Sequence, residues 1–511
     1  MKKPLAVIIG GKGKDRNEMR RIIGSHRLGF SVEDFDSYGG WEDYRIKNQA
    51  TPQLCFLGYH IKYGVNGSNG NLVDKVEIAK KIYETYPLTS ITIMTGPEES
   101  PTTREAIIQA PFLNGPLETS NSPEIVKSWI DRLQREKQLA QELKVGVFGL
   151  GKLGRSVLYQ IQDQRWIKEV HAYSSLETFP HVIESKYGRD FLKELREQYS
   201  QEGQDSDSWK HGMVKALNEM PDFGKTTFHK RLETLVEDDL DVLVITAGEH
   251  LEDLTQYPER KQLLQGSLKK IKPLFSALAK KYEKNQEKIP LLVIESNPPE
   301  DLLSIGKYEY CYPPHKMTSL GADSCRYKTA LLDQLRGVIQ GDKIVEVSIK
   351  PEELIEYREF IGGLNLEDVE LDVVGEHGNA FPLLSHCRLR GKKLEEIEPS
   401  FSKPELAYIL RKDQAETGKK AMIAAGVFES DYKKTPAKVG EGLSDLAHFQ
   451  ERPRSSWICH LDEENAFLMW PTRIDFSNLS VHTNSDINVK NLDPEIREEI
   501  ENQINIQNRI S

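Results

Sequence analysis

The chain has 511 residues, which is too long for one ordinary core and predicts two or three domains at roughly 150 residues each. Its net charge of −11 argues against a general nucleic-acid binder, which needs a basic face, and against an anionic membrane surface as a partner. No apolar run approaches the roughly 18 residues that a membrane-spanning helix needs. We therefore expect a globular protein with neither nucleic acid nor membrane as a partner.

The first residues resemble a secretion signal only superficially, because the apolar run is short and Lys12, Lys14, Asp15 and Arg16 follow it at once. We interpret this run as a first β-strand. The five cysteines are scattered along the chain, without a CxxC pair or a metal-ligand spacing: Cys55, Cys311, Cys325, Cys387 and Cys459. This pattern predicts a reducing, cytoplasmic location and no metal site.

Residues 1–140 are predicted to form a small α/β domain. Apolar runs at Leu5–Ile9, Leu54–Tyr59 and Ser90–Met94 predict strands, and Val73–Tyr86 has a helical pattern. Strands that alternate with helices favour a sheet with some parallel pairing. Glycines and lysines follow the first strand without the full phosphate-loop pattern, so a plain strand-to-helix turn is favoured there. The role of this domain is left open.

A glycine-rich motif begins the second predicted domain, residues 141–310. A short apolar strand runs into Gly149, Gly151 and Gly154, spaced as GxGxxG, and a helix is predicted from about Arg155. The first glycine permits a tight turn, the second lets the backbone approach a pyrophosphate, and the third lets helix and strand pack closely. The strand before it and the helix after it make this motif typical of a dinucleotide-binding turn.

The second strand of this domain, Glu169–Ser174, is expected to end in an acid that holds the ribose hydroxyls. It ends in Tyr173, Ser174 and Ser175 instead, and Glu177 is the nearest carboxylate. No arginine is placed to bind a 2′-phosphate either, so the prediction is NAD, with NADP left open.

Further strands and helices are predicted downstream. Residues 178–238 are polar and mostly helical in pattern. Asp241–Gly248 is a buried strand that ends in small residues, Gln262–Tyr282 is a helix, and Pro290–Glu295 is another buried strand. We expect the strands at 145–148, 242–245 and 291–294 to share one parallel sheet. Asn297, before a proline at a strand end, is as well explained by a common turn as by a functional site.

The third predicted domain, residues 311–511, mixes strands and helices. Asp323 and Arg326 are three apart on a predicted helix and share one face, although a surface ion pair explains them equally well. The alternating run Val369–Val373 predicts a strand that ends in the tight loop VVGEHGN, with His377 at its centre. A small molecule can approach a histidine flanked by glycines, although a lone histidine is more often structural.

Three more elements are predicted in this domain: a strand at Ile344–Ile349, a helix at Glu405–Lys412, and a strand at Ala466–Pro471. The C-terminal segment Asp493–Gln507 predicts a charged amphipathic helix. The simplest interpretation is that its apolar stripe packs against the protein and its charged face is exposed to solvent.

From about Lys144 to its end, the chain resembles the lactate/malate dehydrogenase family. The resemblance rests on stretches in sequential order: GLGKLG, VITAG, Arg260, ESNPPED, GADSCRYKTALL and VVGEHGN. It implies an α/β fold with a Rossmann-type doubly wound parallel sheet and an α+β catalytic domain, to which the N-terminal α/β domain is an addition. It also implies a homo-oligomer, a dimer or a tetramer.

The resemblance assigns roles to five residues. His377 would exchange a proton with the substrate oxygen, Asp323 would hold its imidazole and raise its pKa, and Arg326 would fork onto the substrate carboxylate. Arg260, on a mobile loop, would polarise the carbonyl, and Asn297 would hydrogen-bond near the reacting oxygen. The implied cofactor-binding residues are Gly149, Gly151, Gly154, Ser174, Thr246, Ala247, Gly248 and Asn297. These residue types suit hydride transfer between a nicotinamide cofactor and a 2-hydroxy or 2-keto acid.

The chain also departs from the family pattern. The loop from Gly248 to Arg260 is longer than usual, and its substrate-selecting position falls near His250 or Leu251, with no second arginine. A dicarboxylate needs that extra cation, so a lactate-like acid is predicted over malate. Two other interpretations stay open: a nucleotide-binding regulator or scaffold without activity, and a metal-dependent NAD glycosidase, for which Cys311 and Cys325 lack histidine partners.

Overall fold

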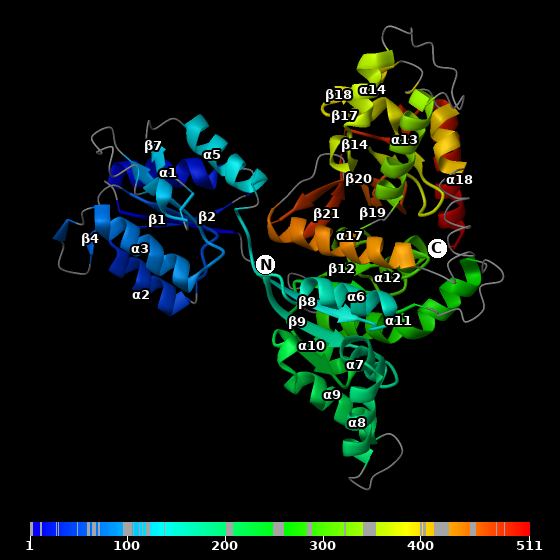
Figure 1. The fold of residues 1–511 in the computed structure, drawn as a ribbon, viewed down its shortest axis with the longest axis horizontal. Helices are drawn as coiled ribbons and strands as arrows, with labels where there is room; N and C mark the ends of the chain where they lie inside the picture. The colour runs from blue at the N-terminus through cyan, green and yellow to red at the C-terminus, as the bar shows by residue number, and fades with distance from the viewer. Residues whose placement is uncertain are drawn as a thin grey trace. The chain divides into compact units, whose positions relative to one another are not determined.

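The fold is given by a computed structural model of the 511-residue chain. It describes the chain except for residues 1–3, 11–12, 27, 29, 49, 59–61, 64–67, 70–71, 96–104, 106, 112, 115, 119–122, 137, 201–207, 249–259, 284–288, 321–322, 341–353, 399–400, 402–404, 413–428, 450–455, 477, 485 and 511. The chain divides into two compact units (Figure 1). The first is Met1–Leu143 with Leu443–Gln450 and Phe476–Asn478, and the second is Lys144–Gly442 with Glu451–Asp475 and Leu479–Ser511.

The first unit is built on a five-stranded sheet in which neighbouring strands run parallel. In sheet order the strands are β2 (Ser31–Phe35), β1 (Leu5–Ile9), β3 (Leu54–Leu57), β6 (Ser90–Thr95) and β7 (Pro116–Glu118). The helices are α1 (Gly13–Gly24), α2 (Tyr38–Asn48), α3 (Leu72–Thr85) and α5 (Pro123–Arg135), and β4 (Lys62–Tyr63) pairs with β5 (Ser68–Asn69). Numbered along the sheet, the order is 2-1-3-4-5, that of the flavodoxin-like doubly wound sheet.

The strands predicted in this unit are confirmed, and their burial explains why the sequence showed them. All residues of β3 and β6 are buried, as expected for parallel strands that helices cover on both faces. Such strands appear in the sequence as continuous apolar runs. The strand β2 was not predicted, because only one of its five residues is buried.

The second unit contains a six-stranded sheet. In sheet order its strands are β10 (Thr226–His229), β9 (Ile167–Tyr173), β8 (Leu143–Phe148), β11 (Val242–Ile245), β12 (Leu291–Ile294) and β13 (Met317–Thr318). Val242 lies opposite both Val145 and Leu291 in parallel register, which confirms the predicted sheet. Numbered along this unit, the order is 3-2-1-4-5-6, which is the Rossmann order.

The strand β10 lies in the segment 178–238, which was expected to be mostly helical and in which no strand was predicted. A four-residue strand with alternating burial leaves too short a pattern to be recognised. The helices of this half of the unit are α6 (Lys152–Ile161), α7 (Phe179–Tyr187), α8 (Arg189–Ser200), α9 (Ser208–Glu219), α10 (Leu232–Glu237), α11 (Arg260–Tyr282) and α12 (Pro299–Tyr308).

The other half of the unit is α+β. Its helices are α13 (Asp323–Gln340), α14 (Leu354–Gly362), α15 (Leu394–Ile397), residues 405–412, α17 (Glu429–Ala447, of which Leu443–Ala447 belongs to the first unit) and α18 (Pro494–Ile510). Its longest strands form one antiparallel sheet: β19 (Ser456–Leu461), β20 (Ala466–Asp475) and β21 (Ser480–Thr483). The predicted strand Val369–Val373 is instead two short ones, β14 (Val369–Glu370) and β15 (Val373–Val374), because they pair with different partners. The strand predicted at Ile344–Ile349 lies outside the described residues.

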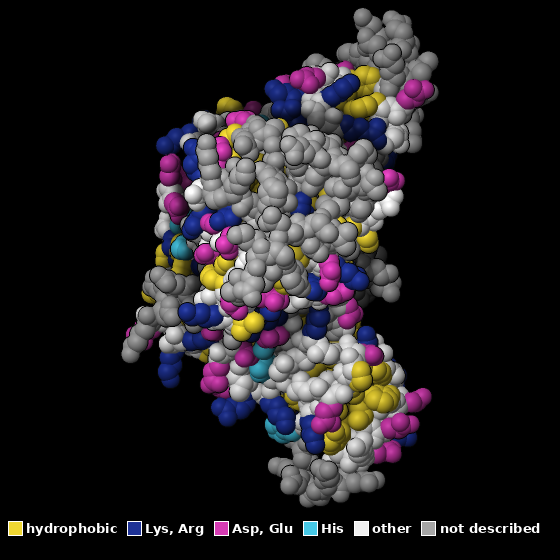
Figure 2. All heavy atoms as spheres, turned by 90° about the vertical axis from the view of Figure 1, so that its left-hand side faces the viewer, with side chains coloured by type: hydrophobic (Ala, Val, Ile, Leu, Met, Phe, Trp, Pro, Cys, Tyr) yellow, Lys and Arg dark blue, Asp and Glu magenta, His cyan; other side chains and the backbone are white. Residues whose placement is uncertain are grey.

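One hydrophobic core runs through both halves of the second unit. It includes Phe275 of α11, Leu303 of α12, Leu331 of α13 and Met469 of β20. None of the described helices is both long and apolar enough to cross a membrane. Figure 2 shows basic and acidic side chains interspersed over the described part of one face.

Candidate functional site

The turn after β8 has the steric requirements of a dinucleotide-binding loop. Gly149 has φ +97°, and a Cβ there would lie 2.6 Å from the backbone nitrogen of Ala247. A Cβ on Gly154 would overlap the carbonyl oxygen of Gly149, whereas a Cβ on Gly151 would meet nothing within 4 Å. The surrounding atoms therefore leave no room for a side chain at the first and third glycines. The second faces open space, on the side where such loops receive a pyrophosphate.

Two side chains hold this loop, from the ends of the two strands that flank β8 in the sheet. Ser174 follows β9, and its Oγ accepts a hydrogen bond of 3.1 Å from the Leu150 N–H. Thr246 follows β11, and its hydroxyl donates to the Gly149 carbonyl at 2.5 Å. Both side chains are buried. The hydroxyl of Ser174, at the position where an acid was expected, thus supports the glycine loop.

The residues after Thr246 are also fixed through their backbone. The Ser296 hydroxyl donates to the Ala247 carbonyl at 2.7 Å, and the Lys270 ammonium group donates to the Gly248 carbonyl at 2.6 Å. The carboxylate of Glu177, the acid nearest to Ser174 in sequence, pairs with Lys210 at 2.8 Å. The predicted substrate-selecting residues, His250 and Leu251, lie outside the described part of the chain.

The carboxyl end of β12 carries a buried acid. Glu295 Oε1 accepts hydrogen bonds from the Leu320 N–H at 2.8 Å and the Ser319 hydroxyl at 3.3 Å. Burial raises the pKa of Glu295 to about 7, and the nearby charge of His377 is among the effects that oppose this rise. Asn297 follows two residues later, before a cis peptide bond to Pro298, and its carbonyl accepts a hydrogen bond of 2.9 Å from Ser267.

The His377 loop lies against the start of α12. The backbone N–H of His377 donates to the carboxylate of Glu300, a fully buried residue in the first turn of that helix. Gly375 and Gly378 flank the histidine with φ of 116° and 77°, a conformation that glycine adopts without strain. Since α12 begins directly after β12, His377 is brought to the carboxyl edge of the six-stranded sheet.

The C-terminal part of the chain fixes the other side of this loop. Gly375 exchanges two backbone hydrogen bonds with Met469 of β20, at 3.0 and 2.8 Å. Gln503 of α18 accepts from the Glu376 N–H at 3.0 Å and donates to the Asn379 carbonyl at 3.1 Å. The loop is therefore clamped by residues about a hundred positions away in sequence.

Helix α13 is tied to the same loop. The hydroxyl of Tyr327 donates to the carbonyl of Ala380 at 2.5 Å, and Tyr327 is fully buried. Arg326, the preceding residue, is half-buried, and Asp323 begins the helix. The side chain of Asp323 lies outside the described atoms, as does that of Arg260 at the start of α11.

Several residues at this site were missed by the sequence analysis, namely Glu295, Glu300, Tyr327 and Gln503. The C-terminal helix has the expected stripe of buried apolar side chains. Among its isoleucines, however, the stripe carries two buried glutamines, Gln503 and Gln507. A polar residue on an otherwise apolar stripe was the available signal, because such a residue needs a hydrogen-bond partner on the element it packs against.

No protein-family model matches the sequence, and no curated protein is significantly similar to it. Among solved structures, malate dehydrogenase from Cryptosporidium parvum is 16% identical, covers 72% of this chain and 98% of its own, and has a TM-score of 0.48. Lactate dehydrogenase from Eimeria maxima, with NADH and oxamate, is 14% identical, covers 72% of this chain and 93% of its own, and has a TM-score of 0.48. Lactate dehydrogenase from Cryptosporidium parvum, with lactic acid and nicotinamide adenine dinucleotide, is 16% identical, covers 73% and 98%, and has a TM-score of 0.47.

Proposed function

We propose that the protein is a nicotinamide-dependent oxidoreductase that interconverts a 2-hydroxy acid and a 2-keto acid. The observation that carries the proposal is that the glycine loop and the His377 loop meet the same edge of one sheet. The first follows the carboxyl end of β8, and the second binds Glu300, just after the carboxyl end of β12. Open α/β sheets of this order bind their ligands at that edge, where the strand order reverses between β8 and β11.

The loop geometry fits a dinucleotide. Gly149 and Gly154 are packed to their limit, and the open side of Gly151 faces the space that a pyrophosphate would take. The dinucleotide would be held by Gly149, Gly151, Gly154, Ser174, Thr246, Ala247, Gly248 and Asn297. A bound nicotinamide ring would supply or accept the hydride. With neither an acid nor an arginine at Ser174, NAD is the first candidate and NADP the second.

The chain's own residues then handle the proton and the carboxylate. In the reductive direction, His377 gives a proton to the substrate oxygen as negative charge builds there. Asp323 orients the imidazole, and the planar guanidinium of Arg326 binds the substrate carboxylate through two parallel hydrogen bonds. Arg260 polarises the carbonyl. Residues 141–310 would bind the cofactor and supply Arg260, and residues 311–511 would supply the other substrate-binding groups.

The substrate is proposed to be lactate-like. The residues between Gly248 and Arg260 offer no second arginine for a dicarboxylate, and they include the acids Glu249, Glu252 and Asp253. A homo-oligomer in the cytoplasm completes the proposal.

One observation favours a second candidate, a dinucleotide-binding protein without turnover. The oxygen of Ser174 is used by the glycine loop, and Glu177 is paired with Lys210, so the ribose lacks its usual acid. Cofactor fluorescence, followed by a screen of 2-keto acids with NADH and NADPH, separates the two. Turnover of a monocarboxylic 2-keto acid supports the dehydrogenase, binding without turnover supports the second candidate, and the absence of binding overturns both.

A further inference from the structure

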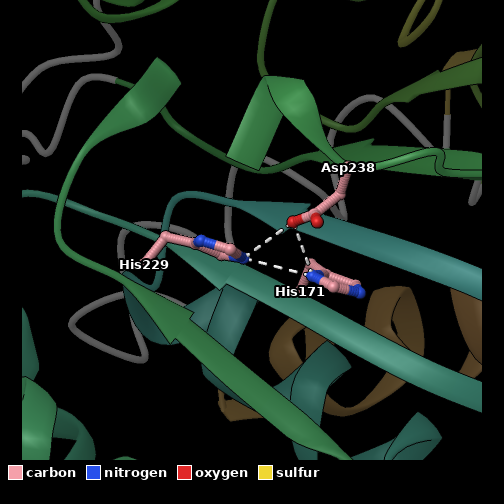
Figure 3. Close-up of side chains that lie close together, drawn as sticks. All are labelled: His171, His229 and Asp238. Carbon is pink, nitrogen blue, oxygen red and sulfur yellow. Dashed lines mark hydrogen bonds and ion pairs between the residues drawn. The ribbon is translucent and has the colours of Figure 1, made fainter. Parts of the chain in front are cut away.

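Two histidines and an aspartate form a cluster on the outer strands of the six-stranded sheet (Figure 3). His171 lies on β9, His229 ends β10, and Asp238 follows α10 directly. His171 Nδ1 lies 3.1 Å from His229 Nε2, and Asp238 Oδ2 lies 2.8 Å from the first nitrogen and 3.1 Å from the second. One nitrogen or oxygen atom of each side chain thus lies within 3.1 Å of the other two.

Hydrogen bonds on the far side of each ring fix which nitrogens carry protons. His171 Nε2 lies 3.3 Å from a carboxylate oxygen of Glu169, which only accepts, so this nitrogen carries the proton. His229 Nδ1 lies 3.1 Å from the Thr234 hydroxyl, whose own proton goes to the Arg231 carbonyl at 2.7 Å. His229 Nδ1 therefore donates as well. In the neutral rings, both inward nitrogens then present lone pairs.

The carboxylate behind His171 is itself paired, since the ammonium group of Lys144 lies 2.8 Å from Glu169. With the outward nitrogens donating, two imidazole lone pairs and a carboxylate oxygen lie about 3 Å from one another. Three electron-rich atoms at this spacing repel one another unless a cation lies between them.

A proton could bridge only two of these three atoms, His171 Nδ1, His229 Nε2 and Asp238 Oδ2. A proton shared by the two rings lies along one edge, and Asp238 Oδ2, a buried atom, accepts no hydrogen bond from the described residues. An ion that binds all three atoms at about 2.05 Å, the usual zinc distance, would sit about 1.1 Å above their plane. In a regular tetrahedral zinc site, two ligand atoms lie about 3.3 Å apart. Each of the three atoms therefore needs to move by only a few tenths of an ångström.

We propose that His171, His229 and Asp238 bind one Zn²⁺ ion, with a water molecule as the fourth ligand. Two imidazoles, one carboxylate and a water are donors that zinc accepts in a four-coordinate site. The histidine side chains are only 10% and 11% exposed, which leaves little room for the three open positions of a six-coordinate iron site. Glu169 and Thr234 orient the two rings from behind, as outer partners of metal-bound histidines do.

The ion would join three elements of the second unit, β9, β10 and the end of α10. It would fasten the edge strand β10 to β9 and anchor the end of α10 to both strands. Binding of the ion is independent of the proposed dehydrogenase activity, since none of the three ligands belongs to the proposed substrate or cofactor residues. The ligands are 58 and 9 residues apart (171 to 229, then 229 to 238), a spacing that no short metal motif has, so no local sequence pattern indicates the site.

The test uses the 511-residue chain, stripped with a chelator and titrated with Zn²⁺ by calorimetry and with Co²⁺ by visible absorption. We expect one equivalent of Co²⁺ to bind with the spectrum of a four-coordinate site and to be displaced by Zn²⁺. Asp238→Asn and His229→Gln should abolish this spectrum. Glu169→Gln, which removes an outer partner, should weaken Zn²⁺ affinity by about 10–100-fold.

His181→Gln, which changes an exposed histidine on α7 of the same unit, is the matched control and should bind Zn²⁺ as the parent does. Saturating Zn²⁺ should raise the Tm of the parent and of this control but leave that of Asp238→Asn unchanged. Comparing the Tm values of the metal-free proteins shows whether each variant folds. The proposal is overturned if the parent takes up no Zn²⁺, which would leave a proton shared by the rings. It is equally overturned if a folded Asp238→Asn variant binds Zn²⁺ as tightly as the parent.

Discussion

The glycine loop after β8 and the His377 loop are built alike but are held in different ways. Each begins at a strand end with a glycine of positive φ, Gly149 at 97° and Gly375 at 116°. The glycine loop packs on itself, since Gly154 lies against the Gly149 carbonyl five positions earlier, and Ser174 and Thr246 each add one hydrogen bond to it. The His377 loop is clamped by Met469 and Gln503, far along the chain.

This difference shows where each loop is vulnerable. A change within the glycine loop acts through local sterics, so its effect follows from the motif. The geometry of the His377 loop depends on α18 and β20, so a change in the C-terminal helix, away from the loop in sequence, is expected to alter catalysis. The following predictions test that contrast.

The largest effect is expected within the glycine loop. Gly154→Ala places a methyl group against the Gly149 carbonyl and 2.6 Å from the Thr246 hydroxyl, and should cost on the order of 4 kcal/mol of unfolding free energy or more. Gly151→Ala, its matched control, meets no protein atom, so its stability should stay close to that of the parent, while its cofactor Kd should rise about tenfold or more. Urea unfolding and fluorescence titration measure the two quantities. Unchanged cofactor affinity in Gly151→Ala would count against the proposed binding site.

His377→Gln should lower kcat/KM by about 10²–10⁴-fold, since it removes the proposed acid and base. Cofactor affinity should be unchanged, because the imidazole is not among the groups that hold the dinucleotide. His386→Gln, at a half-exposed histidine nine residues later, is the control and should keep full activity. Steady-state rates with a 2-keto acid measure the effect. Equal rates in the two variants would remove His377 from the mechanism.

Glu295→Gln should change how stability depends on pH. Burial raises the pKa of Glu295 from 4.5 to about 7, so the folded state binds this proton more tightly than the unfolded state. The protonated carboxyl stabilises the fold fully below about pH 4.5, and this stabilisation is lost as pH rises through about 7. The total loss of unfolding free energy is on the order of 3 kcal/mol. The glutamine does not titrate, so the variant should lose less stability than the parent between pH 5 and pH 8. Unfolding free energies in urea at the two pH values give the comparison, and parallel declines would show that Glu295 is ionised throughout.

Gln503→Leu and Gln507→Leu form a matched pair on α18, because both glutamines are 3% exposed and lie one helical turn apart. Gln503 binds the His377 loop, whereas Gln507 binds both backbone groups of Phe467 in β20. Each change leaves buried backbone groups unpaired and should cost about 1–3 kcal/mol of stability. Only Gln503→Leu should also lower kcat, since it releases the loop. Equal loss of kcat in both variants would mean that general destabilisation explains the effect.

The smallest effect is expected for Arg326→Lys, which replaces a planar fork with a point charge. It should chiefly raise KM for the keto acid, by about tenfold if one of two charge-assisted hydrogen bonds is lost, with a smaller change in kcat. Arg336→Lys, on the same helix, is the control. Initial rates over a range of keto-acid concentrations separate the two constants, and an unchanged KM would mean that Arg326 does not bind the carboxylate.

The sequence by itself determined those features whose residues lie close together along the chain. The buried parallel strands are continuous apolar runs, and the GxGxxG turn places its three requirements within six residues, so β8, β11, β12 and the glycine loop were all predicted. The same holds for the helix that carries Asp323 and Arg326.

The tertiary structure decided what depends on distant pairs. The short strand β10, the clamp of Gln503 on the His377 loop, and the meeting of His171 with His229 and Asp238 each join residues that no local pattern links. In the parallel sheet, each crossover returns the chain to a neighbouring strand after tens of residues, which brings His171 and His229 together. Hydrogen bonds and metal ligands are then selected by proximity in space, to which the sequence order gives no direct guide.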